Sequence, residues 1–164
     1  MPDMRYLRLA LSIFGMCSVA AMVAGCAHTT QFASMPDQSK AVENPAKARI
    51  YLVRTAKVFG DGVGIQFYMT GSGSVGAFGE NSSRFVGEIG PGHYLCWEVT
   101  PGIIKLNLVQ GDPKSAVELK VDAGQTWYLR AYIRAGLIAP KAAIDVVPEA
   151  EGKALLKRCK PPNT

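Results

Sequence analysis

Residues 126–134, TWYLRAYIR, alternate between apolar and polar side chains along their whole length. A period of two is the signature of a β-strand with one face in a core, because successive side chains point to opposite sides. The predicted core face carries Trp127, Leu129, Ala131 and Ile133. This segment therefore predicts a strand with one face in the core of a β-rich domain.

The same alternation recurs along the chain from residue 48, between turns that contain glycine or proline. It marks strands at 48–54, 64–70, 93–99, 103–109, 116–121 and 142–147, with shorter strands near 74–78 and 84–89. Turns spaced in this way are typical of a sandwich or a small barrel. Residues 149–159, EAEGKALLKRC, predict a short helix that Gly152 weakens. We therefore predict an all-β fold, an antiparallel β-sandwich of about 7–9 short strands with a short C-terminal helix.

Composition agrees with one folded domain. The chain has 164 residues, of which 48% are hydrophobic and 19% charged, so it is too apolar for a disordered protein. Its 17 glycines and 10 prolines disfavour a helical bundle. The net charge of +5 is spread along the sequence, and this scatter favours a solvated surface or weak attraction to anionic envelope polymers over nucleic-acid binding.

The N-terminus has the order of an export signal. Arg5 and Arg8 precede an uncharged run over residues 9–23, and small residues lead to Cys26. The alternative is a transmembrane helix, but the run is short against the roughly 17–25 apolar residues that spanning requires. The prediction is a cleaved secretory signal.

Residues 23–26, VAGC, resemble the lipobox of bacterial lipoproteins. The resemblance implies that Cys26 is acylated with fatty chains such as palmitate and becomes the first residue after cleavage; the alternative is a cysteine that follows the apolar run by chance. Ala27 in the next position implies sorting to the outer membrane, with the domain facing the periplasm. The predicted division is a signal peptide at 1–25, a lipidated flexible tether at 26–47, the β-sandwich at 48–159 and a tail at 160–164.

Two cysteines, Cys96 and Cys159, remain for the exported domain. An oxidising compartment favours a disulfide between them, worth about 4 kcal/mol on the chain-entropy model, and the alternative is two unpaired thiols. On the strand at 93–99, Cys96 faces away from the core, where the C-terminal helix is expected. His93 lies on the other face, so the two do not form a metal site.

No catalytic, metal-binding or cofactor-binding residues are predicted. Residues 71–76, GSGSVG, satisfy a dinucleotide-binding pattern of glycines, but no helix follows them, so a hairpin loop is the better interpretation. The best candidate for binding is the outer face of the predicted strand at 126–134. Its alternating stripe consists of Tyr128, Arg130, Tyr132 and Arg134. Such a stripe suits a carboxylate, a sugar or an acidic segment, although a solvated sheet face gives the same pattern.

Several short motifs, taken in order, resemble a known family. They are Tyr51 and Arg54, residues 91–94 (PGHY), 99–102 (VTPG), 123–125 (AGQ) with Trp127 and Tyr128, and 145–147 (DVV). They resemble small bacterial lipoproteins of domain-of-unknown-function family 2846 over roughly residues 48–158. The resemblance implies a β-sandwich and brings no established activity and no catalytic residues.

The predicted function is that of a membrane-anchored envelope lipoprotein, a non-enzymatic binding or structural module for another envelope protein or a cell-wall component. One alternative is an envelope hydrolase acting on cell-wall or lipid material, which would need two carboxylates, or His93 and an acid, in one pocket. The other is a surface adhesion or secretion accessory.

Overall fold

The computed structural model describes residues 28–56, 62–71, 83–109, 115–136 and 139–162. Its strands are β1 (Thr30–Gln31), β2 (Ala48–Arg54), β3 (Ile65–Gly71), β4 (Arg84–Ile89), β5 (His93–Val99), β6 (Gly102–Leu108), β7 (Val117–Val121), β8 (Thr126–Arg134) and β9 (Lys141–Val147), followed by helix α2 (Glu149–Leu156). Within these ranges, no helix is long and apolar enough to cross a membrane.

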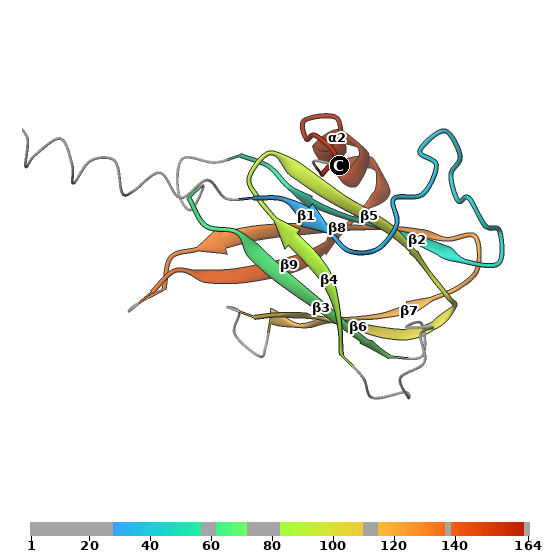
Figure 1. Ribbon diagram of the computed structural model, residues 1–164, viewed down its shortest axis with the longest axis horizontal. Helices are drawn as coiled ribbons and strands as arrows, with labels where there is room; N and C mark the ends of the chain where they lie inside the picture. The colour runs from blue at the N-terminus through green and yellow to red at the C-terminus, as the bar shows by residue number, and fades with distance from the viewer. Residues whose placement is uncertain (1–27, 57–61, 72–82, 110–114, 137–138, 163–164) are drawn as a thin grey trace, which may run out of the picture.

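The strands form two sheets packed face to face (Figure 1). The five-stranded sheet has the order β1-β4-β3-β6-β7, and the four-stranded sheet has the order β5-β2-β8-β9. The predicted β-sandwich with a short C-terminal helix is confirmed. One pair departs from the antiparallel pattern, because β2 runs parallel to β8. The predicted strand at 74–78 and most of the glycine-rich segment 71–76 lie outside the described residues.

The core lies between the sheets and follows the predicted parity. Leu95, Trp97 and Val99 of β5 point into it, and Cys96 points to the opposite side of the four-stranded sheet. Strand β2 differs from the alternating expectation, since all seven of its residues are buried. Its outer face is therefore covered as well as its inner face.

Part of that cover is the segment 28–47, which we call the strap. The expected flexible tether at 26–47 is wrong over these described residues. Thr29 is 2% exposed, and its hydroxyl accepts a hydrogen bond from the Gly90 N–H at 2.8 Å. The strap continues as β1, which pairs antiparallel with β4, and then passes across to the four-stranded sheet. A polar composition suggested a tether, but these polar groups are used for contacts with the domain.

Gly87 permits the strap to dock. A Cβ at this position would overlap the carbonyl oxygen of Thr30 in β1. The residue has φ 157°, and the pairing of β3 with β4 shifts register beside it, between Phe67 and Tyr68. A glycine inside a strand often marks such a bulge or a close backbone approach, and here both occur together.

Helix α2 packs on the outer face of the four-stranded sheet, over β8 and β2. Gly152 is the buried residue of this helix, and a Cβ there would overlap the side chain of Tyr128. The glycine that weakens the helix in isolation therefore allows the helix to approach the sheet. Tyr128 in turn stacks on Tyr51, with ring centroids 5.2 Å apart and planes inclined by 7°.

Replacement of Gly152 by alanine should therefore lower the free energy of unfolding, although helix propensity alone predicts an increase. Propensity alone would stabilise the helix by about 1 kcal/mol. Overlap with Tyr128 makes Gly152→Ala destabilising by about 1–3 kcal/mol instead. Urea unfolding of the full chain measures the change. Lys153→Ala on the exposed side of the same helix is the control and should stay within about 0.5 kcal/mol; a Gly152→Ala chain more stable than the parent contradicts the packing.

Candidate functional site

The strap joins the edges of the two sheets through Gln31. Its side-chain amide donates to the carbonyl of Cys96 at 2.7 Å and accepts from the N–H of Cys96 at 2.8 Å. An amide side chain thus takes the place of a neighbouring strand along β5. An uncovered edge invites pairing with other chains, so Gln31 both closes the sandwich and protects the edge of β5.

A buried ion pair fixes the second half of the strap. Arg49 of β2 is fully buried, and its guanidinium lies 3.0 Å from a carboxylate oxygen of Glu98 on β5. The same guanidinium donates to the carbonyls of Asp37 at 3.0 Å and Lys40 at 2.5 Å. Arg49 is therefore no part of a solvated basic surface, because its charge is enclosed by the strap.

Glu98 also binds the strap directly. It accepts hydrogen bonds from the backbone N–H groups of Glu43 at 2.5 Å and Asn44 at 3.1 Å. Burial alone would raise the pKa of this carboxyl, but the two N–H donors and the Arg49 guanidinium outweigh it, so the pKa of Glu98 lies below its ordinary value. Glu98 is therefore held as a carboxylate that anchors the loop above it.

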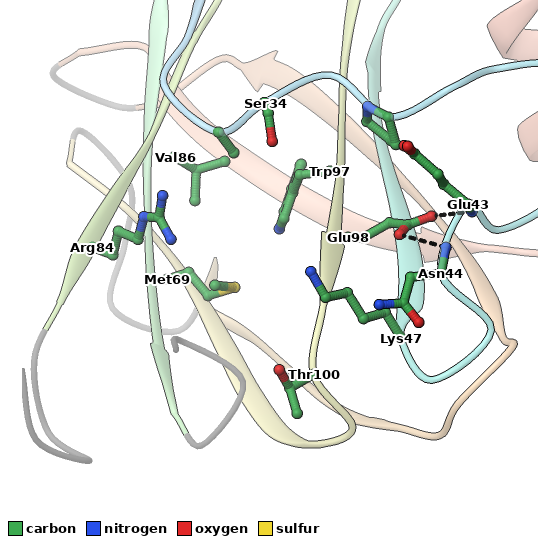
Figure 2. Close-up of a pocket in the computed structure, with 12 residues that line it drawn as sticks. Ser34, Glu43, Asn44, Lys47, Met69, Arg84, Val86, Trp97, Glu98 and Thr100 are labelled. Carbon is green, nitrogen blue, oxygen red and sulfur yellow. Dashed lines mark hydrogen bonds between the residues drawn. The ribbon is translucent and has the colours of Figure 1, made fainter. Parts of the chain in front are cut away.

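A cavity of about 400 Å³ lies where the strap passes between the sheets (Figure 2). Its walls come from the strap, from β3 and β4 of one sheet and from β5 of the other. They are lined by Ala33, Ser34, Pro36, Glu43, Asn44, Lys47, Met69, Arg84, Val86, Trp97, Glu98 and Thr100. The cavity is thus a product of strap docking, because the sheets alone would leave this side open.

Trp97 gives the cavity an unusual polar group. The residue is 2% exposed, and its indole Nε1 has no hydrogen-bond partner among the described residues. An indole N–H is a donor only, and leaving a buried donor unmatched costs about 1–3 kcal/mol. Figure 2 shows this nitrogen at the end of the ring that faces Lys47 and Met69. The wall of the cavity therefore includes a residue whose buried N–H donor has no partner among the described residues.

Two carboxylates, those of Glu43 and Glu98, line this one cavity, which is the arrangement that a hydrolase would need. Glu98 is saturated by Arg49 and by two N–H groups, and its lowered pKa is the opposite of what a general acid requires. Glu43 accepts from the Asp37 N–H at 2.9 Å. His93 lies elsewhere, with Nδ1 2.9 Å from the Pro91 carbonyl in the turn before β5. No group of three potential metal ligands occurs in the described ranges.

The predicted stripe on β8 is not brought together as one surface. Tyr128 is 6% exposed beneath α2. Arg130 pairs with Asp145 at 3.1 Å and with Glu151 at 3.0 Å, and its guanidinium lies 5.7 Å from the ring centre of Tyr132. Arg134 is exposed at the end of the strand. The stripe therefore serves largely to seat the helix, because acids from β9 and α2 occupy Arg130.

The predicted disulfide is absent from the structure, in which Cys96 and Cys159 are free thiols. Both belong to the cluster under α2, as the outward parity of Cys96 predicts. Cys96 is paired with Tyr51, however, and the Cys159 thiol lies against the carbonyl of Arg54 at 3.5 Å. The two cysteines therefore lie beside different residues of β2, Tyr51 and Arg54.

Sequence reasoning missed the residues of the cavity. The alternation that turns Cys96 away from the core turns its neighbour Trp97 into it, as the structure confirms, but the unmatched N–H of Trp97 depends on neighbours that are distant in the sequence. Lys47 and Arg84 carry no local signal, since each flanks a strand in a sequence with many such cations. Cys26, the predicted lipidation site, lies outside the described residues.

Comparison with known proteins finds no matching family model and no significant match among curated proteins. The resemblance to family 2846 stays a prediction.

The lowered pKa of Glu98 gives strap docking a pH dependence. A depressed carboxyl pKa contributes stability above the ordinary pKa of about 4.3, and this contribution is lost as pH falls through the folded value. We expect the free energy of unfolding to fall between about pH 5 and pH 3, with a shallower slope in Glu98→Gln. That variant should lose about 3 kcal/mol at pH 7, because Arg49 is left buried without its counter-charge.

Urea unfolding of the full chain across this pH range measures both effects. Glu118→Gln is the matched control, because Glu118 is exposed on β7. An equal slope in the parent and Glu98→Gln would show that the ion pair does not hold the strap.

Proposed function

We propose that this chain is a membrane-anchored lipoprotein of the bacterial cell envelope and acts as a non-enzymatic binding module in the periplasm at the outer membrane. The observation that carries the binding role is the unmatched indole N–H of Trp97 at a cavity of about 400 Å³. A buried donor without a partner is uncommon in folded proteins and needs an explanation, and an acceptor from a ligand supplies one. The partner is another component of the envelope.

The strap changes the expected geometry of anchoring. If Cys26 carries the lipid, a single residue, Ala27, separates it from the described strap. Thr29 is already buried against Gly90, so the chain has almost no slack. An extended residue spans at most about 3.6 Å, and the domain would therefore rest at the bilayer surface instead of standing away from it.

An exposed aromatic group lies close to this point. Phe32 is 68% exposed on the strap and contacts Phe85 of β4, with ring centroids 5.0 Å apart. Phe85 contacts Tyr68 of β3 at the same centroid distance of 5.0 Å. Aromatic side chains partition well into the membrane interface, so this cluster supports an orientation with the β1–β4 edge toward the lipid.

Loss of the acylated thiol tests the anchor. Cys26→Ala should move the protein from the membrane fraction to the soluble fraction, since one or more acyl chains supply most of the membrane affinity. Fractionation of cells followed by immunoblotting measures the change, and mass spectrometry of the parent should find an acylated N-terminal cysteine. Cys159→Ala, which removes a thiol far from the leader, should remain in the membrane. A parent with an intact leader and no acyl chain would refute the lipoprotein assignment.

Photo-crosslinking in intact cells tests the binding role. A photoreactive residue in place of Ser34, at the exposed rim of the cavity, should give a crosslinked adduct. The adduct should be lost when Trp97→Phe is added, because phenylalanine keeps an aromatic ring and removes the N–H donor. A photoreactive residue at Lys120, exposed on β7 away from the cavity, is the control. An adduct of unchanged strength with Trp97→Phe would place binding elsewhere.

A further inference from the structure

We infer that the cavity binds the terminal carboxylate of a ligand with a short apolar group next to it, an inference that rests on the proposed binding function. The candidate ligands are the C-terminus of a peptide and a small free carboxylic acid. Both present the same chemistry, a planar monoanion on an apolar stem.

The donors of the cavity converge from three parts of the chain. Lys47 ends the strap, Arg84 begins β4, and Trp97 lies within β5. In Figure 2 the Lys47 ammonium points toward the space beneath the indole nitrogen, and the Arg84 guanidinium extends toward it from the opposite wall. Neither cation forms an ion pair with another described residue. Two cations without an ion pair in the described ranges, together with an unmatched neutral donor, suit an anion that accepts several hydrogen bonds.

The acids of the cavity limit the charge of that anion. Glu43 and Glu98 line the wall beside Asn44, and Glu98 alone is neutralised, by Arg49. A dianion such as phosphate would be repelled by the negative charge of Glu43. A carboxylate has half the charge of that dianion and is therefore repelled less. The lining therefore favours a monoanion.

The apolar lining predicts what accompanies the carboxylate. Met69 and Val86 lie on the sheet side, and Ala33 and Pro36 lie on the strap. Met69 is 3% exposed, and it lines the same cavity as Trp97. An unbranched thioether adapts readily, so Met69 can move aside to let a carboxylate oxygen reach the N–H and can then pack on the stem of the ligand.

Trp97 provides a direct reporter for the test. The chain has two tryptophans, so Trp127→Phe leaves Trp97 as the sole indole of the purified full chain. The probes are N-acetyl-alanyl-alanine, isovalerate, the carboxamide of each, and inorganic phosphate. We expect saturable changes in fluorescence with both acids and a downfield shift of the Trp97 indole N–H resonance. Each carboxamide should bind at least about tenfold more weakly, because it lacks the charge.

The relative affinity of the two acids identifies the source, since a tighter dipeptide indicates a peptide C-terminus and a tighter isovalerate indicates a small acid. Carboxamides that bind within twofold of the acids, phosphate that binds more tightly than both acids, or no saturable change at millimolar concentrations would each overturn the inference. A Ser34 adduct that still depends on Trp97 would then show that the binding function stands and the ligand class is wrong.

Charge variants locate the carboxylate. Lys47→Gln and Arg84→Gln should each weaken binding of the acids by about tenfold or more and leave the weak carboxamide binding unchanged. Lys120→Gln removes an exposed cation from β7, outside the cavity, and should leave both affinities unchanged. Equal weakening of acid and carboxamide in Lys47→Gln would indicate a damaged strap without a charge contact and would count against the assignment.

Discussion

The buried pair between Arg49 and Glu98 is the interaction on which the rest of this structure depends. Each partner would be costly to bury alone, because a desolvated charge needs both a counter-charge and hydrogen bonds. Arg49 obtains these from strap carbonyls, and Glu98 obtains them from strap N–H groups. The strap therefore supplies most of the hydrogen bonds to a charge pair that the two strands β2 and β5 bring together, although Nε of Arg49 has no partner among the described residues. The ion pair alone leaves further hydrogen-bonding capacity on both side chains, and the strap uses that capacity, while Ala33 and Met35 add apolar contacts with the domain.

This constraint explains why the sandwich has a cavity at one side. The edges of β4 and β5 face each other there, and Gln31 and β1 bridge them without adding a full strand. Space remains between the strap and the inward face of β5. The indole of Trp97 is too large to adopt another orientation in a close-packed core. Its N–H therefore stays beside the place where the strap passes between the sheets. The cavity and its unmatched donor are consequences of closing a sandwich with a polar segment.

The sequence predicted the sheets better than the site, for physical reasons. Alternation in β5, β6, β7 and β8 is a local property, so the parity of Trp97, Leu129 and their neighbours could be inferred from spacing. The docking of the strap could not be inferred from spacing, because β1 has two residues. Gln31 of β1 depends on partners such as Gly87 and Cys96, about 56 and 65 positions away in the sequence. Gly152 shows the same limit: local propensity marks it as a defect of the helix, and its role is visible once Tyr128 is placed beneath it. The stripe on β8 was a local pattern with a tertiary explanation, since α2 covers its first residue, and Glu151 of α2 and Asp145 of β9 pair with Arg130.

Under the proposed function, anchor and cavity are mechanically one unit. The lipid would attach two residues before His28, and the same strap supplies Ser34, Lys47 and part of the apolar wall. A pull on the anchor would be transmitted first to the short β1 pairing and then to the Gln31 and Glu98 contacts. These contacts are few compared with those inside either sheet, so local opening of the strap should cost less than opening a sheet. Opening it would remove Lys47 and expose Trp97 together. A ligand that bridges Lys47 and Arg84 would oppose this opening, because it links the strap to β4 through a charge contact that the free protein lacks. Ligand binding and retention of the domain against the membrane would therefore strengthen each other through the same twenty residues.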